Sequence, residues 1–210
     1  MAISFAEAME RDPMTDLAPR GAFERDLAVA VSAAQEDASS VSVAVLDVDL
    51  FGQLNAAQGR AAGDAALARL AERLRAALSP NGAAVYRIGG DGFGVVLAGV
   101  DKEQAFLYLE QFRHAAAGAG PTVSIGVASF PDDATKHNEV FLKACEALYR
   151  AKVSGRNKAC LAREEKMVTK TSHYTQGQLL GLRRLAEREG IGEAVLLREA
   201  LNDLLRKHNA

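Results

Sequence analysis

The sequence predicts an α/β protein with a mostly antiparallel central sheet flanked by helices, followed by a small second unit. Strand-like and helix-like segments mix without the strict strand–helix–strand order that is typical of a parallel sheet. The stretch 85–97 also reads as two apolar strands joined by Gly89-Gly90-Asp91-Gly92. This turn sequence favours an antiparallel hairpin, because glycine adopts positive φ angles at little cost.

The remaining elements of the first 160 residues follow from hydrophobic spacing, caps and breakers. Residues 1–11 have the spacing of a short amphipathic helix, and 12–19 form a turn-rich entry. β-Branched runs predict the strands outside the hairpin. The expected helices cover 20–36, 51–58, 63–79, 102–117 and 138–153, and the expected strands cover 41–47 and 122–128.

The tail is predicted to be a separate unit. A charged segment, 163–166, marks a linker, and 167–175 can form one short strand. Amphipathic helices are expected over 176–189 and 192–207. Because one strand and two helices cannot bury a core alone, we expect this unit to form a homodimer.

Composition indicates a soluble globular chain. The 210 residues are 49% hydrophobic and carry a net charge of −2. The first residues lack the basic and apolar regions of a signal peptide, and no apolar run is long enough to span a bilayer. The two cysteines, Cys145 and Cys160, are typical of reduced thiols. These features predict a cytoplasmic protein without a membrane partner.

Carboxylates lie at two of the predicted turns. The strand 41–47 runs into Asp47-Val48-Asp49, and Asp91 lies at the tip of the hairpin. Carboxylates at a strand end, opposite another on a hairpin, are a plausible site for Mg²⁺ carried by phosphates. The alternative for an isolated Asp-x-Asp pair is a solvated surface.

Several short motifs occur in order along this part of the chain. They are Asp12 to Phe23, Asp47 to Phe51, the spaced set Asn55, Gly59, Gly63 and Asp64, Arg87 to Phe93, Ser124 to Val127 and Ala147 to Asn157. On these motifs, residues 12–160 resemble the GGDEF (diguanylate cyclase) family. The resemblance implies a nucleotidyl cyclase or palm-like fold over 12–162. It also implies condensation of two GTP molecules into cyclic di-GMP by two copies of the domain, face to face.

The resemblance also implies roles for individual residues. Asp47, the carbonyl of Val48 and Asp91 would hold Mg²⁺ with a bound nucleotide, and Asp47 and Asp91 would be the catalytic residues if the protein is active. Asn55 and Asp64 would read guanine, since carboxylate and amide groups match its edge. The other nucleotide-binding residues would be Phe51, Gly89, Gly90, Lys152 and Arg156, the last two as phosphate ligands.

The chain departs from the family's pattern within this site. Gly92 stands where the family has Glu, and Gly52 replaces a Lys that contacts phosphate. One preorganised group of this kind can be worth roughly 10²–10³ in rate, so impaired synthesis is expected. The other departures are Ala56, Arg60 and Cys145, together with Pro80 and Ala83 in place of the product-inhibition motif Arg-x-x-Asp.

The tail has a resemblance of its own. The segments 174–179, 182–191 and 197–205 resemble the ribbon-helix-helix DNA-binding family, with the domain covering 167–210. The resemblance implies a two-stranded ribbon in the major groove. Candidate DNA contacts are Thr169, Lys170, Thr171 and His173. Glu193 and the small positive net charge of the tail argue against DNA, and the alternative is a tail that only dimerises.

Three functions therefore remain open from the sequence. The first is a catalytically impaired GGDEF protein that binds a guanine nucleotide, GTP or cyclic di-GMP, and acts as a dimeric DNA-binding regulator. The second is an active or weak diguanylate cyclase dimerised by its tail. The third is a structural interaction module with a dead site.

Overall fold

The computed structural model describes residues 11–118, 120–162, 171–189 and 192–208. The predicted N-terminal helix and the linker 163–166 lie outside these residues. The chain divides into two compact units, Met1–Glu165 and Lys166–Ala210, which are described separately below.

The first unit is built on a mixed sheet of six strands in the order β1-β3-β4-β2-β5-β6. The central pairs β3–β4, β4–β2 and β2–β5 are antiparallel, as the hairpin predicted, whereas the edge pairs β1–β3 and β5–β6 are parallel. The two edge strands β1 and β6 were not predicted, because they are too short to show an alternating pattern. The strands are β1 (Ala18–Pro19), β2 (Val41–Val48), β3 (Ala84–Gly89), β4 (Gly92–Ala98), β5 (Val123–Phe130) and β6 (Ala159–Leu161).

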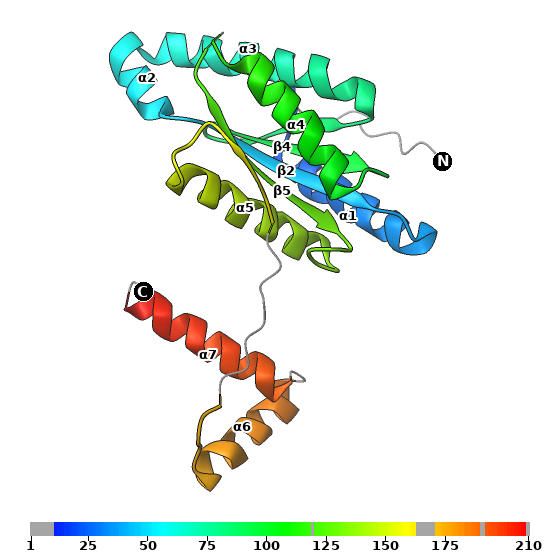
Figure 1. Ribbon diagram of the computed structural model, residues 1–210, viewed down its shortest axis with the longest axis vertical. Coiled ribbons are helices and arrows are strands. Elements are labelled where there is room, and N and C mark those ends of the chain that lie inside the picture. Colours follow the sequence, from blue (N-terminus) through cyan, green and yellow to red (C-terminus); the bar gives the residue numbers. More distant parts are fainter. Residues whose placement is uncertain (1–10, 119, 163–170, 190–191, 209–210) are drawn as a thin grey trace. The chain divides into compact units, whose positions relative to one another are not determined.

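Helices cover both faces of this sheet (Figure 1). Helix α3 (Arg60–Leu78) buries its leucines, and helix α4 (Lys102–Ala116) buries Leu109 and Phe112, against one face. Helices α1 (Arg20–Asp37) and α5 (His137–Val153) bury mainly alanines and Phe23 against the other. The sheet is therefore the middle layer of three, and its two faces carry separate hydrophobic clusters.

Helix α2 (Phe51–Gln58) extends from the end of β2 and contacts α3. Leu50, with a φ of 56°, turns the chain from the strand into this helix. Helix α3 begins at Arg60, three residues earlier than predicted, because Gly59 takes a φ of 83° and starts the helix itself. A short 3₁₀ turn, η1 (Ser79–Asn81), which contains Pro80, follows the end of α3.

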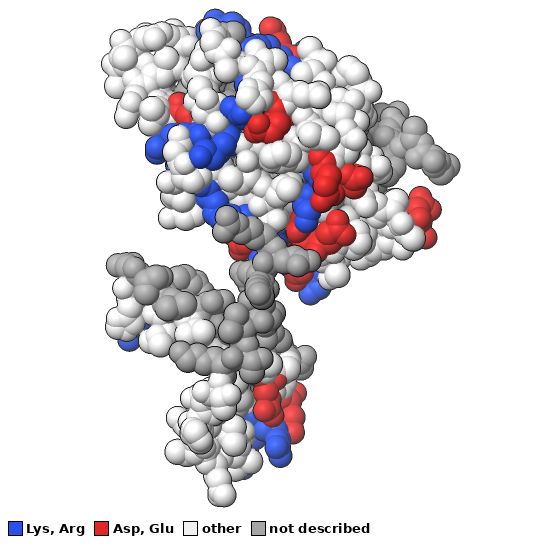
Figure 2. Space-filling model, viewed as in Figure 1, with Lys and Arg blue, Asp and Glu red and all other residues white. Residues whose placement is uncertain are grey.

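Charge is divided over the surface of this unit. On the face shown in Figure 2, basic side chains lie mostly towards the left of the unit and acidic ones towards its right. Among the described residues, no helix has the length and apolar character needed to cross a membrane.

The second unit contains helices α6 (Gln176–Glu189) and α7 (Glu193–Lys207), which contact each other. The predicted strand 167–175 is wrong where it can be checked, since residues 171–175 have no strand hydrogen bonding, and 167–170 lie outside the described residues. A ribbon strand needs a second chain for its hydrogen bonds, so one copy offers it no partner. Several large apolar side chains are exposed here, among them Leu180, Leu201 and Leu204.

Candidate functional site

The candidate site lies where β2 ends beside the tip of the β3–β4 hairpin. In the antiparallel register, Asp47 of β2 is directly opposite Gly92 of β4. The amide of Val48 donates to the carbonyl oxygen of Asp91 at 3.3 Å, which fixes the tip against the strand end. Because directly opposed residues share one face of a sheet, a side chain at position 92 would lie next to Asp47. The structure thus places Asp47, Val48 and Asp91 next to one another in the chain fold.

Arg87 holds the hairpin turn in place. Gly89 and Gly90 have φ angles of 121° and 53°, so the turn depends on glycine there. The buried guanidinium of Arg87 donates to the carbonyl of Gly92 at 2.8 Å and to that of Gly90, and it lies 4.7 Å from the centroid of the Phe93 ring. Burial lowers the pKa of Arg87. The sequence analysis missed this role, although an arginine inside an apolar strand was a signal for it.

Lys152 of α5 reaches the predicted metal carboxylate. Its Nζ lies 2.6 Å from Oδ1 of Asp47, an oxygen that is buried and accepts no regular hydrogen bond. Burial raises the pKa of the Asp47 carboxyl; the ammonium of Lys152 opposes this rise, and the neighbouring charge of Asp91 adds to it. The side chains of Asp47 and Lys152 are 17% and 33% exposed, so a ligand can approach the pair from solvent.

Asp49 has a structural role instead of a ligand-binding one. Its carboxylate accepts hydrogen bonds from the hydroxyls of Thr122 (2.7 Å) and Ser124 (2.6 Å) and from the amide of Asn157 (2.9 Å). The side chain is buried and ties the end of β2 to β5 and to the turn after α5. The Asp-x-Asp pair therefore contributes one carboxylate, Asp47, to the site.

The magnesium ion implied by the family resemblance does not fit this arrangement as it stands. The ammonium of Lys152 occupies Oδ1 of Asp47 at hydrogen-bonding distance. Gly92 provides no carboxylate opposite Asp47, and Asp49 is fully hydrogen-bonded. In the described ranges, no three or more His, Cys, Asp or Glu side chains are grouped so that they could hold a metal ion.

The predicted guanine-reading residues lie on the α2–α3 pair. Asn55 is half-buried on α2, and its Oδ1 lies against Gly63 of α3 without a hydrogen-bond partner. A Cβ at Gly63 would overlap this amide and come within 3.1 Å of the Phe51 ring, so the glycine makes room for both side chains. Asp64 follows Gly63 and is exposed. An unpartnered amide oxygen beside an open carboxylate is a suitable pair for a heterocycle edge.

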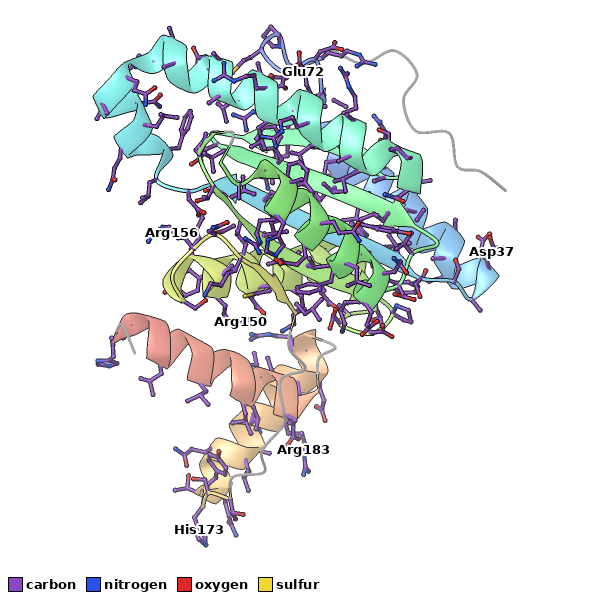
Figure 3. All side chains as sticks on the ribbon, turned by 45° about the horizontal axis from the view of Figure 1, so that its top comes forward. Asp37, Glu72, Arg150, Arg156, His173 and Arg183 are labelled. Carbon is purple, nitrogen blue, oxygen red and sulfur yellow. The ribbon has the colours of Figure 1, made fainter. Side chains whose placement is uncertain are left out.

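Arg156 lies in the turn after α5 and is exposed. Its φ angle is 61°, and its amide donates to the carbonyl of Ala151 at 3.0 Å, which closes the helix. Figure 3 shows Arg156 at the same end of the sheet as α2.

Of the predicted DNA contacts, Thr171 and His173 are exposed, and Thr169 and Lys170 lie outside the described residues.

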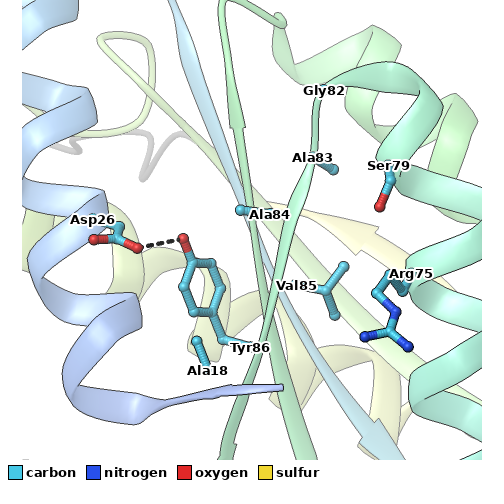
Figure 4. A pocket seen from close by; sticks show the side chains of 9 residues that line it. All are labelled: Ala18, Asp26, Arg75, Ser79, Gly82, Ala83, Ala84, Val85 and Tyr86. Atoms are coloured by element: carbon cyan, nitrogen blue, oxygen red, sulfur yellow. Dashed lines mark hydrogen bonds between the residues drawn. The ribbon is translucent and has the colours of Figure 1, made fainter. Parts of the chain in front are cut away.

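A hollow of about 320 Å³ lies away from this site, beside β3 and between α1 and α3 (Figure 4). Ala83 forms part of its wall. This residue is one of the two that stand in place of the family's product-inhibition motif. On the α1 side, the buried hydroxyl of Tyr86 donates to Asp26 at 2.9 Å. Asp26 also pairs with Arg25 at 2.8 Å. The polar groups of this wall are thus already satisfied by one another.

Replacing Tyr86 with Phe is expected to lower the free energy of unfolding by about 1 kcal/mol at neutral pH, because one buried hydrogen bond is lost. Burial, followed by the hydrogen bond to Asp26, raises the pKa of Tyr86 above its ordinary value of 10.0. Above pH 10, the Tyr86 hydroxyl ionises in the unfolded chain before it ionises in the folded protein. This difference favours the unfolded chain, so the free energy of unfolding of the parent protein falls. Urea unfolding at pH 7 and at pH 10.5 should show the difference between parent and variant shrinking at the higher pH.

Comparisons with known proteins agree with this geometry. The family described as "Diguanylate cyclase, GGDEF domain" matches residues 9–158. The chain is 31% identical over 159 residues to the probable diguanylate cyclase DgcT of Escherichia coli, covering 70% of this chain and 34% of the relative. It is 34% identical over 152 residues to the diguanylate cyclase DgcS of Shewanella oneidensis, covering 70% of this chain and 50% of the relative. It thus spans half or less of the length of these curated relatives.

Solved structures show the same fold. The GGDEF domain of DgcB from Caulobacter crescentus, in complex with c-di-GMP, has a TM-score of 0.69 and 27% identity, covering 76% of this chain and 99% of that one. The active GGEEF domain of a diguanylate cyclase from Vibrio cholerae has a TM-score of 0.67 and 28% identity, covering 71% and 99% of the two chains.

Proposed function

The chain belongs to the GGDEF family, and we propose from this that it binds a guanine nucleotide, GTP or cyclic di-GMP, and forms cyclic di-GMP slowly. One observation carries the proposal. Asp47, Asp91 and Lys152 gather at one end of the sheet, while the residue directly opposite Asp47 is Gly92. The chain thus has the groups that the family resemblance assigns to metal and phosphate, but it lacks the carboxylate that the family has at position 92.

The missing carboxylate supports slow synthesis. Phosphoryl transfer depends on charges held ready for the transition state, and one such group is typically worth roughly 10²–10³ in rate. Gly52, near the start of α2, removes a further cation that the family resemblance assigns to phosphate. No covalent intermediate on the protein is needed in this chemistry, so positioning and electrostatics account for most of the rate.

Guanine selectivity is assigned to Asn55 and Asp64. The exposed carboxylate of Asp64 can accept from the N–H groups of guanine, which adenine does not present in the same pattern. The Oδ1 of Asn55 has no hydrogen-bond partner but is buried against Gly63, so the amide must turn towards the nucleotide to accept a further N–H group. Binding therefore has a chemical reason to distinguish GTP from ATP.

Replacing Asp64 with Ala is expected to weaken GTP binding by roughly 10–100-fold, because hydrogen bonds to a charged group are lost. The matched control is Glu72→Ala on the exposed surface of α3 (Figure 3), which should leave binding unchanged. Equilibrium titration of the full chain with fluorescent GTP and ATP analogues measures both. Equal affinity for the two nucleotides in the parent protein would contradict the proposal.

A second candidate is a working diguanylate cyclase. The curated relatives carry that name, and Asp47 and Asp91 are retained. Incubation with Mg²⁺ and GTP, followed by chromatography, separates the two functions. Cyclic di-GMP accumulating at many turnovers per minute in the unmodified chain would favour the cyclase.

The tail is proposed to join two copies of the chain. Its two described helices expose Leu179, Leu197, Leu201 and further apolar side chains, and too few residues are present to bury them within one copy. DNA binding through Thr169, Lys170, Thr171 and His173 stays a prediction from the sequence. Light scattering of the full chain checks the dimer, and a salt titration of duplex DNA binding checks the second prediction.

A further inference from the structure

The ion pair between Asp47 and Lys152 lies where a divalent cation would be expected in the proposed nucleotide site. The Nζ atom lies 2.6 Å from Oδ1 of Asp47. An ammonium group has three donors and no acceptor, so an ion pair with one carboxylate oxygen leaves donors for other oxygens. The side chain is one-third exposed, at 33%, and these donors can reach an incoming phosphate.

Two cations already lie among the carboxylates around the pair. The ammonium of Lys152 interacts with Asp47, and the buried guanidinium of Arg87 interacts with Asp47, Asp91 and Asp12. Both oxygens of Asp49 already accept hydrogen bonds, Oδ1 from Ser124 and Oδ2 from Thr122 and Asn157. A site that attracts a divalent cation normally has an excess of carboxylates, and Gly92 removes the carboxylate that would have supplied it.

We propose that Lys152 provides in this chain the positive charge that a divalent cation would provide, so that the guanine nucleotide binds without a metal ion. In this arrangement Asp47 is a positioning residue: it holds the ammonium at the phosphate site through a direct ion pair. Arg156, four residues further along the chain, lies in the turn that follows α5 and supplies a second phosphate contact from the same side. This inference rests on the proposed guanine-nucleotide binding.

The test is a binding titration of the full chain with a fluorescent GTP analogue, in excess EDTA and in millimolar Mg²⁺. The Kd values under the two conditions are expected to agree within about threefold. Lys152→Met should weaken binding in EDTA by at least about tenfold, the effect of one charge-assisted hydrogen bond. Lys152→Arg, which keeps the charge, should retain most of the affinity and shows that the position tolerates substitution.

Two further variants sharpen the result. Lys158→Met removes a nearby lysine that donates to the backbone of Ser154, and it should leave the Kd unchanged. Gly92→Glu adds the missing carboxylate and should make binding depend on Mg²⁺. Binding that is tenfold or more weaker in EDTA than in Mg²⁺ in the parent chain would overturn the inference and leave the proposed function standing. Absence of binding under both conditions would overturn both.

Discussion

Gly92→Glu is expected to raise the rate of cyclic di-GMP formation by roughly 10²–10³-fold, the value of one preorganised group at a phosphoryl centre. The register places this side chain directly opposite Asp47, so the new carboxylate lies next to Asp47 on the same face of the sheet. The backbone accepts the change, since Gly92 is not in the left-handed region. A Cβ there would lie 3.2 Å from the carbonyl oxygen of Gly89 and 3.4 Å from Ile88, which requires only a small adjustment.

The matched control is Gly92→Gln, which has nearly the same shape and no charge. Initial rates with GTP and Mg²⁺, measured by chromatography, should rise for the Glu variant alone. A Glu variant that folds, binds GTP and stays as slow as the parent would mean that Gly52 or another departure limits the chemistry. That outcome would contradict the assignment of the slow rate to position 92.

Much of the first unit could be predicted from local pattern. Gly89-Gly90-Asp91-Gly92 predicts the hairpin because two glycines there take positive φ. Asp101, an aspartate just before the predicted helix 102–117, caps α4 and accepts from the amide of Gln104 at 2.7 Å. The short strands β1 and β6 were missed, because two or three residues cannot show a period and form only where a neighbouring strand is already present.

The site was predictable as a set of residues and not as a set of contacts. Asp47 and Asp49 look equivalent in the sequence, and only the fold brings Thr122 and Ser124 to Asp49 and Lys152 to Asp47. These contacts join residues far apart in the chain, so no local spacing encodes them. The tail shows the same limit more strongly, because its expected strand depends on hydrogen bonds from another chain.

Gly126→Ala is expected to lower the free energy of unfolding by about 3 kcal/mol, at the upper end of what overpacking usually causes. Gly126 lies in β5, and a Cβ there would fall well inside van der Waals contact with the Ala144 carbonyl oxygen and the Leu148 amide of α5. Both atoms belong to the helix backbone, so no side-chain rotation can relieve the overlap. The helix must move away from the sheet, which opens a gap between them. The buried face of α5 is made of small side chains that cannot fill this gap.

Gly52→Ala is the matched control, because nothing lies within 4 Å of a Cβ at that exposed position in α2. Alanine there should leave stability unchanged or raise it by up to about 1 kcal/mol. Urea unfolding of both full-length variants, followed by circular dichroism, measures the difference. Since α5 also carries Lys152, the folded Gly126→Ala variant should bind nucleotide more weakly than the parent. A variant that unfolds at the parent's urea concentration would show that α5 does not lie as close to β5 as its backbone contacts require.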